Sequence, residues 1–172
     1  MNDSLTLNER PEVLTKKKVS PTAAAYHTVT PYLIVKGAAK AIEFYHSVFG
    51  ASETMRFPGP NGTIVHAEIK IGDSPVMLAD EMPGMEFRSA SALGGSPVGI
   101  LLYVEDVDAC AAKAVAAGAT VVKPVQDQFY GDRSGTFTDP FGHLWTIATH
   151  IEDVSPQEMQ RRMSQMKPCG AS

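Results

Sequence analysis

Apolar and polar positions along this chain follow the same pattern twice. The β-branched and aromatic residues from Tyr26 to Val35 predict a strand, and the apolar residues at helical spacing that follow predict a helix ending at Gly50. A second predicted strand, residues 100–104, leads into a helix that ends at Gly118, and equivalent positions lie 69 residues apart. A short repeated unit cannot close a core alone. We therefore expect the two copies to pack together, with a site at their seam.

Each predicted helix is followed by sequence that favours strands. In the first copy these strands are residues 54–57, 63–71 and 74–79, and in the second they are residues 120–122, 135–138 and 144–149. Gly72-Asp73 is typical of a two-residue hairpin turn. The sequence therefore predicts an α+β fold. Two tandem β-α-β-β-β modules, residues 27–81 and 97–150, form a cupped mixed β-sheet around a cavity, with the helices on the outside.

Three further segments flank or connect the modules of this single domain, residues 26–151. Residues 1–25 are polar without a sustained period, which predicts a disordered or loosely attached N-terminal tail. Residues 82–96 are rich in Gly, Ser, Ala and Met and predict a flexible linker. Residues 152–172 contain helix-start signals at Ser155 and the positions after it, so we expect a short C-terminal helix and tail.

The linker carries candidates for a lid over the cavity. Met82, Met85 and Phe87 are apolar, and methionine adapts to varied apolar shapes. The alternative is that these side chains are loop residues packed on the body of the protein. The sequence leaves the role of the linker open.

Composition excludes several classes of protein. The 172 residues are 44% apolar and 20% charged, as in an ordinary globular domain. A net charge of -4 argues against a nucleic-acid or anionic-membrane partner. No segment has the apolar length of a membrane span, and the N-terminus lacks an apolar signal core. Cys110 and Cys169 do not make a disulfide framework and are expected to be free thiols, so a cytoplasmic location is the default expectation.

Four segments, in this order, carry a resemblance to a known family: Pro31-Tyr32-Leu33-Ile34-Val35, Phe44-Tyr45 through Phe49-Gly50, His66-Ala67-Glu68, and Asp139-Pro140-Phe141-Gly142-His143-Leu144-Trp145. Together with the repeat, they resemble the glyoxalase/bleomycin-resistance/extradiol-dioxygenase (vicinal oxygen chelate) superfamily over roughly Thr28 to His150. The subgroup they resemble is the phosphonate-operon-B-like or demethylubiquinone-methyltransferase-like one. The resemblance implies two curved sheets that cup a cavity, usually in a homodimer.

The resemblance also implies where a metal would be held. In metal-using members, each module gives one ligand from its first strand and one from its last, and the matching positions here are Thr30, Met77, Gly99 and Thr146. Sites for zinc, nickel or non-haem iron need imidazole, carboxylate or thiolate donors. These four residues cannot supply a three-donor set. We therefore expect no metal at the usual site and predict no cofactor.

His66 and Glu68 are the leading candidates for chemistry in the cavity. Counting back from a turn at Gly72-Asp73 places Glu68 opposite Met77, and alternation puts His66 on the same face. The pair could act as an acid/base couple or as part of a displaced metal site. The alternative is a polar pair at the cavity wall that orients a ligand or a water, and the lack of a third donor favours it.

The segment 128–133 supplies two further candidates for ligand binding. Tyr130 could stack on a ligand and Arg133 could pair with an anionic group at the cavity rim. The alternative is that Asp132 and Arg133 tie down a β-turn. His150, at the end of the last strand, could approach the cavity mouth, but a surface position is the favoured expectation. Trp145 is expected to point toward the helices as part of the core.

Two functional hypotheses follow. The first is a metal-free cavity protein that binds a small, partly apolar organic molecule, in the manner of antibiotic-sequestering members of the family. The second is a lyase, isomerase or dioxygenase-like enzyme with a non-standard divalent-metal site that uses His66 and Glu68. A structural dimerisation module would leave the cavity unexplained. Whether the protein is an enzyme, and which molecule it binds, stay open.

Overall fold

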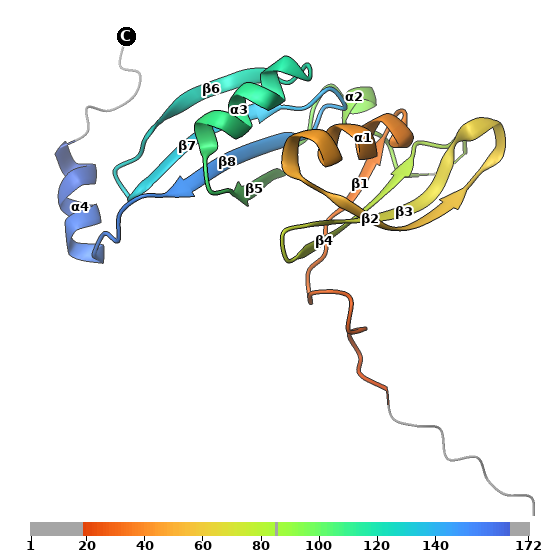
Figure 1. The fold of residues 1–172 in the computed structure, drawn as a ribbon, viewed down its shortest axis with the longest axis horizontal. Coiled ribbons are helices and arrows are strands. Elements are labelled where there is room, and N and C mark those ends of the chain that lie inside the picture. The colour runs from red at the N-terminus through yellow and green to blue at the C-terminus, as the bar shows by residue number, and fades with distance from the viewer. Residues whose placement is uncertain (1–18, 85, 166–172) are drawn as a thin grey trace, which may run out of the picture.

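The computed structural model describes residues 19–84 and 86–165, and its two β-α-β-β-β modules follow one another along the chain (Figure 1). The first module contains β1 (Tyr32–Val35), α1 (Ala38–Phe49), β2 (Ser52–Pro58), a 3₁₀ turn (Pro60–Gly62), β3 (Ile64–Ile71) and β4 (Ser74–Asp80). The second contains β5 (Gly99–Tyr103), α3 (Val107–Ala116), β6 (Thr120–Asp127), β7 (Asp132–Thr138) and β8 (Leu144–His150). A short helix α2 (Ala90–Leu93) lies between the modules, and α4 (Pro156–Gln165) follows the second.

Each module builds one four-stranded mixed sheet. The strand orders are β1-β4-β3-β2 in the first sheet and β5-β8-β7-β6 in the second, and only the β1–β4 and β5–β8 pairs are parallel. Tyr32 pairs with Met77 and Leu101 pairs with Thr146, so the repeat seen in the sequence is also the repeat of strand register. The predicted α+β class and tandem modules are confirmed.

The predicted hairpin register is also confirmed. Ile71 pairs with Ser74 around the turn, and Glu68 pairs with Met77. Gly72 has a φ of 59°, in the left-handed region that a tight two-residue turn needs and that glycine adopts without strain. Because the register has no slip between β3 and β4, the side chains assigned to one face by counting do share that face.

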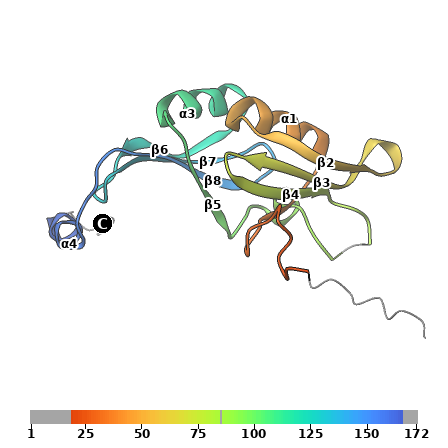
Figure 2. The same cartoon turned by 60° about the horizontal axis from the view of Figure 1, so that its bottom comes forward.

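The long helix of each module, α1 in the first and α3 in the second, covers the same side of the molecule. α1 and α3 lie next to each other over the two sheets, and the other face of each sheet is turned away from them (Figures 1 and 2). Ala67 and Ile69 of β3 are buried beneath the helices, whereas Leu101 and Tyr103 of β5 are exposed on the opposite face. The two sheets lie side by side within one chain. The face of each sheet that is turned away from the helices, called its open face from here on, is therefore uncovered over much of its area.

An aromatic cluster with one buried carboxylate joins the modules. Trp145 is 2% exposed and packs against Phe49 and Tyr45, with ring centroids 4.8 and 5.5 Å away. The carboxylate of Asp139 accepts hydrogen bonds from the Tyr45 hydroxyl at 2.7 Å and the Trp145 indole at 2.9 Å. Its other oxygen accepts from the backbone N–H groups of Phe141 and His143. Trp145 belongs to the core, as predicted.

The ends and the linker differ in part from the predictions. The first strand begins at Tyr32 rather than Tyr26, and β6 and β7 extend over residues 120–127 and 132–138, beyond their predicted limits. The linker contains helix α2, capped by the buried Ser89, whose hydroxyl accepts from the N–H of Ala92. Cys110 is a buried free cysteine, and the predictions for Met85, Cys169 and most of the N-terminal tail fall outside the described residues.

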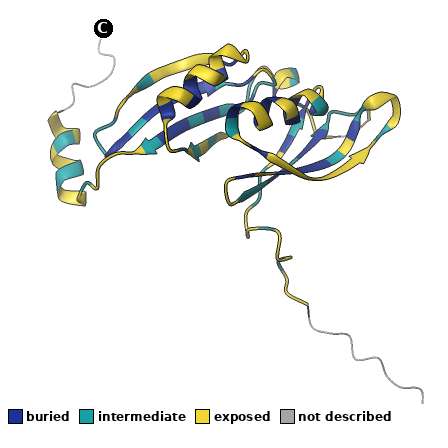
Figure 3. Cartoon of the chain, viewed as in Figure 1, coloured by how far each residue is buried: buried dark blue, intermediate teal, exposed yellow. Residues whose placement is uncertain are grey.

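Helix α4 stands apart from both modules at the far end of the second sheet (Figures 1 and 3). None of its residues is buried, and Arg162 holds it through a two-pronged ion pair with Glu152, at 2.7 and 2.8 Å. This is the short C-terminal helix that the sequence predicted. Among the helices of the described ranges, none is long and apolar enough to cross a membrane.

Candidate functional site

Four side chains on the open face of the first sheet form one hydrogen-bonded chain. The hydroxyl of Tyr32 on β1 lies 3.1 Å from Nδ1 of His66 on β3, and Nε2 of His66 lies 3.2 Å from Oε1 of Glu68. The hydroxyl of Tyr26 donates a 2.5 Å hydrogen bond to the same carboxylate oxygen. Phe57 of β2 stacks on His66 with ring centroids 6.0 Å apart. The structure therefore brings His66 and Glu68 together and adds two tyrosines that the sequence did not single out.

A single tautomer of a neutral His66 satisfies every contact in this chain. With its proton on Nε2, the imidazole donates to Glu68 and accepts from the Tyr32 hydroxyl. The hydrogen bond from Tyr26 lowers the pKa of Glu68 below its ordinary value, His66 adds to this effect, and burial opposes it. The same bond raises the pKa of Tyr26. Two phenols and an imidazole thus surround an ionised carboxylate.

An apolar pocket of about 110 Å³ adjoins this polar chain. Asp80 is the one charged residue that the described part of the chain contributes to its wall, and the other lining residues are Tyr32, Ile34, Val65, Ala79, Met82 and Phe87. Two of these residues, Met82 and Phe87, come from the linker between the modules, a placement that fits a lid and equally fits loop residues packed on the body. Met77 lies on the adjacent strand β4, directly opposite Glu68 in the register. The first sheet therefore offers apolar surface and a polar anchor side by side.

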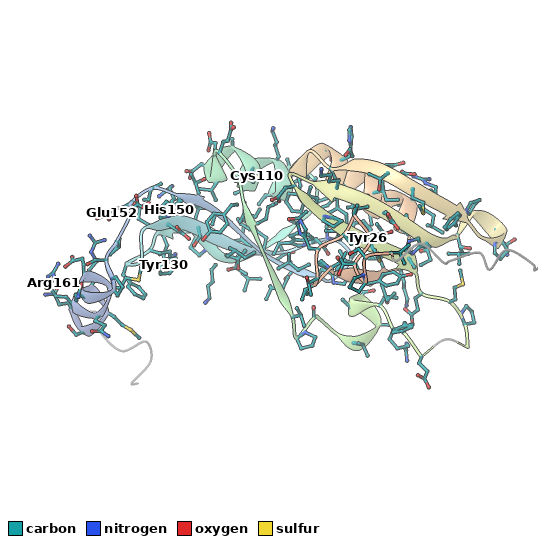
Figure 4. The ribbon with its side chains drawn as sticks, turned by 90° about the horizontal axis from the view of Figure 1, so that it is seen from below. Tyr26, Cys110, Tyr130, His150, Glu152 and Arg161 are labelled. Atoms are coloured by element: carbon teal, nitrogen blue, oxygen red, sulfur yellow. The ribbon has the colours of Figure 1, made fainter. Side chains whose placement is uncertain are left out.

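A second polar chain occupies the open face of the second sheet. Asp132 on β7 is 5% exposed, and its two oxygens contact different partners: the Tyr103 hydroxyl at 2.7 Å and Nδ1 of His150 at 2.8 Å. The other ring nitrogen of His150 lies 3.0 Å from Asp153. Figure 4 shows His150 at the α4 end of the second sheet, far from Tyr26 on the first module. His150 is exposed, as expected of a surface residue, and in addition both of its ring nitrogens contact carboxylates.

The two carboxylates beside His150 favour the protonated form of its imidazole. The hydrogen bond to Asp132, followed by that to Asp153, raises the pKa of His150 above its ordinary value of about 6.5. The resulting stabilisation is fully present below the pKa of the unfolded chain and is lost as pH rises through the higher folded-state pKa. A titration of the imidazole resonances by NMR should give a midpoint above about 6.5 for His150, and a lower midpoint in Asp153→Ala. A wild-type midpoint at or below the ordinary value would contradict the geometry.

Arg133 does not reach the open face. Its side chain points to the helix side of the second sheet, where Nε and Nη2 donate to Asp108 at 2.7 and 2.8 Å, and Nη1 donates to Asp127 at 2.8 Å. All three bonds go to carboxylates of the same chain, so the guanidinium ties α3 and β6 to β7. The structure therefore favours a structural role for Arg133, although with partners other than the predicted turn.

Tyr130 lies in the turn before β7, next to Phe129, with ring centroids 5.2 Å apart in an edge-to-face arrangement. It is partly exposed, and Figure 4 shows it between the end of the second sheet and α4. This position is at the same end of the open face as His150. Tyr130 is therefore separate from the His66 and Glu68 chain within one subunit.

The positions that hold metal in related metalloenzymes do not fit a metal here. The Thr30 hydroxyl donates to the His27 carbonyl, and the hydroxyls of Thr146 and Thr136 lie 3.2 Å apart. Met77 and Gly99 add no hard or borderline donor. In residues 19–84 and 86–165, no group of three or more His, Cys, Asp or Glu side chains is placed to hold a metal ion.

A larger groove of about 760 Å³ runs between the two modules. Its first wall includes His27, Val29 and the turn between β3 and β4, and its second wall is β5. Leu101 and Tyr103 of β5, which line it, are 54% and 56% exposed. Exposed apolar side chains next to one another in a groove are typical of binding surfaces.

Comparison with known proteins gives a consistent family. The family model for the Glyoxalase/Bleomycin resistance protein/Dioxygenase superfamily matches residues 25–147. An uncharacterized protein of Mycobacterium bovis, Mb0911c, is 45% identical over 139 residues, which are 79% of this chain and 91% of that protein. The described fold and the sequence thus point to the same group of proteins.

Solved structures agree. The crystal structure of TioX from Micromonospora sp. ML1 is 31% identical, covers 71% of this chain and 97% of its own, and has a TM-score of 0.57. A putative 3-demethylubiquinone-9 3-methyltransferase, the PhnB protein of Bacillus cereus, is 19% identical, covers 72% of this chain and 99% of its own, and has a TM-score of 0.59. The second likeness is one of fold alone.

Proposed function

The chain belongs to the Glyoxalase/Bleomycin resistance protein/Dioxygenase superfamily, and from this we propose that it is a metal-independent protein that binds a small, partly apolar organic molecule by sequestration. One observation carries the proposal. The ligand positions of the metalloenzymes hold Thr30, Met77, Gly99 and Thr146, while the first sheet carries a largely apolar pocket. One wall of this pocket is Tyr32, which is linked to Glu68 through His66. Such a surface binds through apolar burial with a few polar anchors.

We further propose that the working unit is a homodimer whose cavity lies between the first sheet of one subunit and the second sheet of its partner. The open faces carry Tyr32, Phe57, Leu101 and Tyr103 at 50%, 54%, 54% and 56% exposure. β1 and β5 are edge strands of their sheets. A second copy, related by two-fold symmetry, would cover the open faces of both sheets at once and enclose two equivalent cavities.

The alternative is a lyase, isomerase or dioxygenase-like enzyme with a non-standard metal site. The approach of His66 Nε2 to Glu68 at 3.2 Å favours it, because such a pair can move a proton or contribute two donors to a metal. A third donor within reach is needed to complete a metal site. Tyr26 and Tyr32 already engage this pair.

Metal analysis and a thermal-shift experiment separate the two. We expect purified protein to carry substoichiometric zinc, nickel, iron and manganese, and its melting temperature not to rise when these ions are added. Metal-free bleomycin, as a peptide-like aromatic probe, should raise the melting temperature by about 5 °C at a hundredfold excess over Kd. Stoichiometric metal that is lost in His66→Ala and Glu68→Ala would sink the metal-independent proposal.

A further inference from the structure

The two oxygens of the Glu68 carboxylate are used unequally. Oε1 accepts from the Tyr26 hydroxyl and contacts Nε2 of His66. No donor of the described residues reaches Oε2. Every fully buried side-chain nitrogen or oxygen in the described ranges has a hydrogen-bond partner, so Oε2 is not sealed inside the protein. A carboxylate that is 90% buried as a side chain, since only 10% is exposed, thus presents one free acceptor to the open face.

Apart from His66, no basic side chain of residues 19–84 and 86–165 makes an ion pair with Glu68. Within the described part of the chain, every arginine is engaged by a carboxylate elsewhere, in the pairs Arg56–Glu53, Arg88–Glu81, Arg133–Asp108, Arg161–Glu158 and Arg162–Glu152. Lys70, two positions along β3, is exposed, and no ion pair joins it to Glu68. Because hydrogen bonding lowers the pKa of Glu68, the free oxygen carries negative charge at neutral pH.

Aromatic rings lie on both sides of His66, the histidine that contacts Glu68. Tyr32 and Phe57 flank His66, with an edge-to-face contact at 5.6 Å on one side and a stacked contact at 6.0 Å on the other. Tyr32, which contacts His66, also lines the largely apolar pocket together with Phe87. Aromatic faces attract cations, and the attraction grows when water is excluded.

The open face of the second sheet also carries negative charge. Asp132 is buried with both oxygens occupied, by Tyr103 and by His150, and Asp153 contacts the other nitrogen of His150. Even with a protonated His150, two carboxylates outnumber one imidazolium on this face. In the proposed dimer, this face would lie opposite Glu68 and add to the negative potential of the cavity.

Resting on the proposed function, we infer that the ligand of this cavity is a cation: an aromatic molecule with a protonated amine, which donates to Oε2 of Glu68 while its rings lie against Tyr32, Phe57 and Phe87. A charge-assisted hydrogen bond in a partly buried site provides the selectivity. Anionic ligands, phosphonates and carboxylates included, meet a carboxylate whose one ion-pairing partner in the described chain is His66, already bound to Oε1, and are disfavoured. The anchor is Glu68, with Tyr26 and His66 as positioning residues that hold Oε1.

Three probes with the same indole ring and nearly the same length test this inference by isothermal titration calorimetry. Tryptamine is a cation, tryptophol is neutral and indole-3-propionate is an anion at pH 7. We expect affinity to fall in that order on the wild-type protein, with tryptamine about tenfold tighter than tryptophol. Glu68→Gln should weaken tryptamine about tenfold and leave tryptophol within about twofold. Glu43→Gln, on the exposed side of α1, is the matched control and should change neither.

Each result bears on the inference. The charge order is measured on the wild-type protein, so a folding defect in Glu68→Gln leaves the test valid. Equal affinities, a preference for indole-3-propionate, or a Glu68→Gln variant that retains the tryptamine preference would overturn the cationic ligand class but leave the sequestration proposal standing. Failure of all three probes to bind also overturns it. The metal and bleomycin measurements then decide the proposed function separately.

Discussion

Replacing Asp139 by alanine should lower the free energy of unfolding by about 3–5 kcal/mol. The carboxylate is 5% exposed and accepts four hydrogen bonds, from the Tyr45 hydroxyl, the Trp145 indole and two backbone N–H groups. Removing it leaves these donors buried without partners, and each such group costs about 1–3 kcal/mol. The cluster also joins α1 of the first module to the β7–β8 turn of the second. Loss of Asp139 should therefore loosen the contact between modules.

Urea unfolding followed by circular dichroism measures this effect, and Asp153→Ala is the matched control. Asp153 is fully exposed, so its removal should change stability by no more than about 0.5 kcal/mol at pH 8. Burial, followed by Asp139 itself, raises the pKa of Tyr45 well above its ordinary value, so the tyrosine stays a donor throughout the accessible pH range. A loss below about 1 kcal/mol in Asp139→Ala would show that water or rearrangement satisfies the donors.

Sequence reasoning succeeded where local pattern determines structure. The repeat predicted two modules of the right element order, and the Gly72-Asp73 turn fixed a register that holds along the hairpin. Alternation from that register placed His66 and Glu68 on one face, and alternation along the last strand placed Trp145 in the core. These inferences need only the two-residue period of a strand and the geometry of a tight turn.

Contacts between distant segments could not be predicted in the same way. Tyr26 reaches Glu68 across 42 residues from a stretch without regular structure, and no period in the sequence indicates that approach. Arg133 was misplaced because β7 starts at Asp132, earlier than predicted. With the true start, alternation puts Asp132 on the open face and Arg133 on the helix side.

Both sheets carry a hydrogen-bonded group of tyrosine, carboxylate and histidine, but the residues do not occupy equivalent positions of the repeat. In the 69-residue repeat Glu68 corresponds to Phe137, so the sequence by itself indicates a site in the first module alone. The structure shows a tyrosine, a carboxylate and a histidine on each open face. In the second sheet they come from Tyr103, Asp132 and His150, which correspond to Ile34, Thr63 and Glu81 in the first. Because the same residue types lie at different positions in the two modules, a residue-by-residue comparison of the halves cannot detect them.

If the open faces are covered by a second copy, Leu101→Glu should convert the protein to monomers. Leu101 is 54% exposed on the face of β5 opposite to Ile100 and Leu102, which pack against the core. A glutamate there would cost little in the monomer. In the proposed dimer it would be buried without a partner next to the cavity, weakening the dimer about a hundredfold or more.

Sedimentation equilibrium over a concentration series measures this dissociation constant. Val115→Glu is the matched control, because Val115 is 46% exposed on α3, on the helix side that the proposed dimer leaves free. It should leave the dimer intact. If the second sheet of the partner completes the cavity, Leu101→Glu should also weaken the binding of tryptamine. A wild-type protein that stays monomeric at high micromolar concentration, or equal dissociation constants for the two variants, would contradict the shared cavity. In that event the single chain must bind its ligand on the open first sheet, where Glu68 and its tyrosines already lie together.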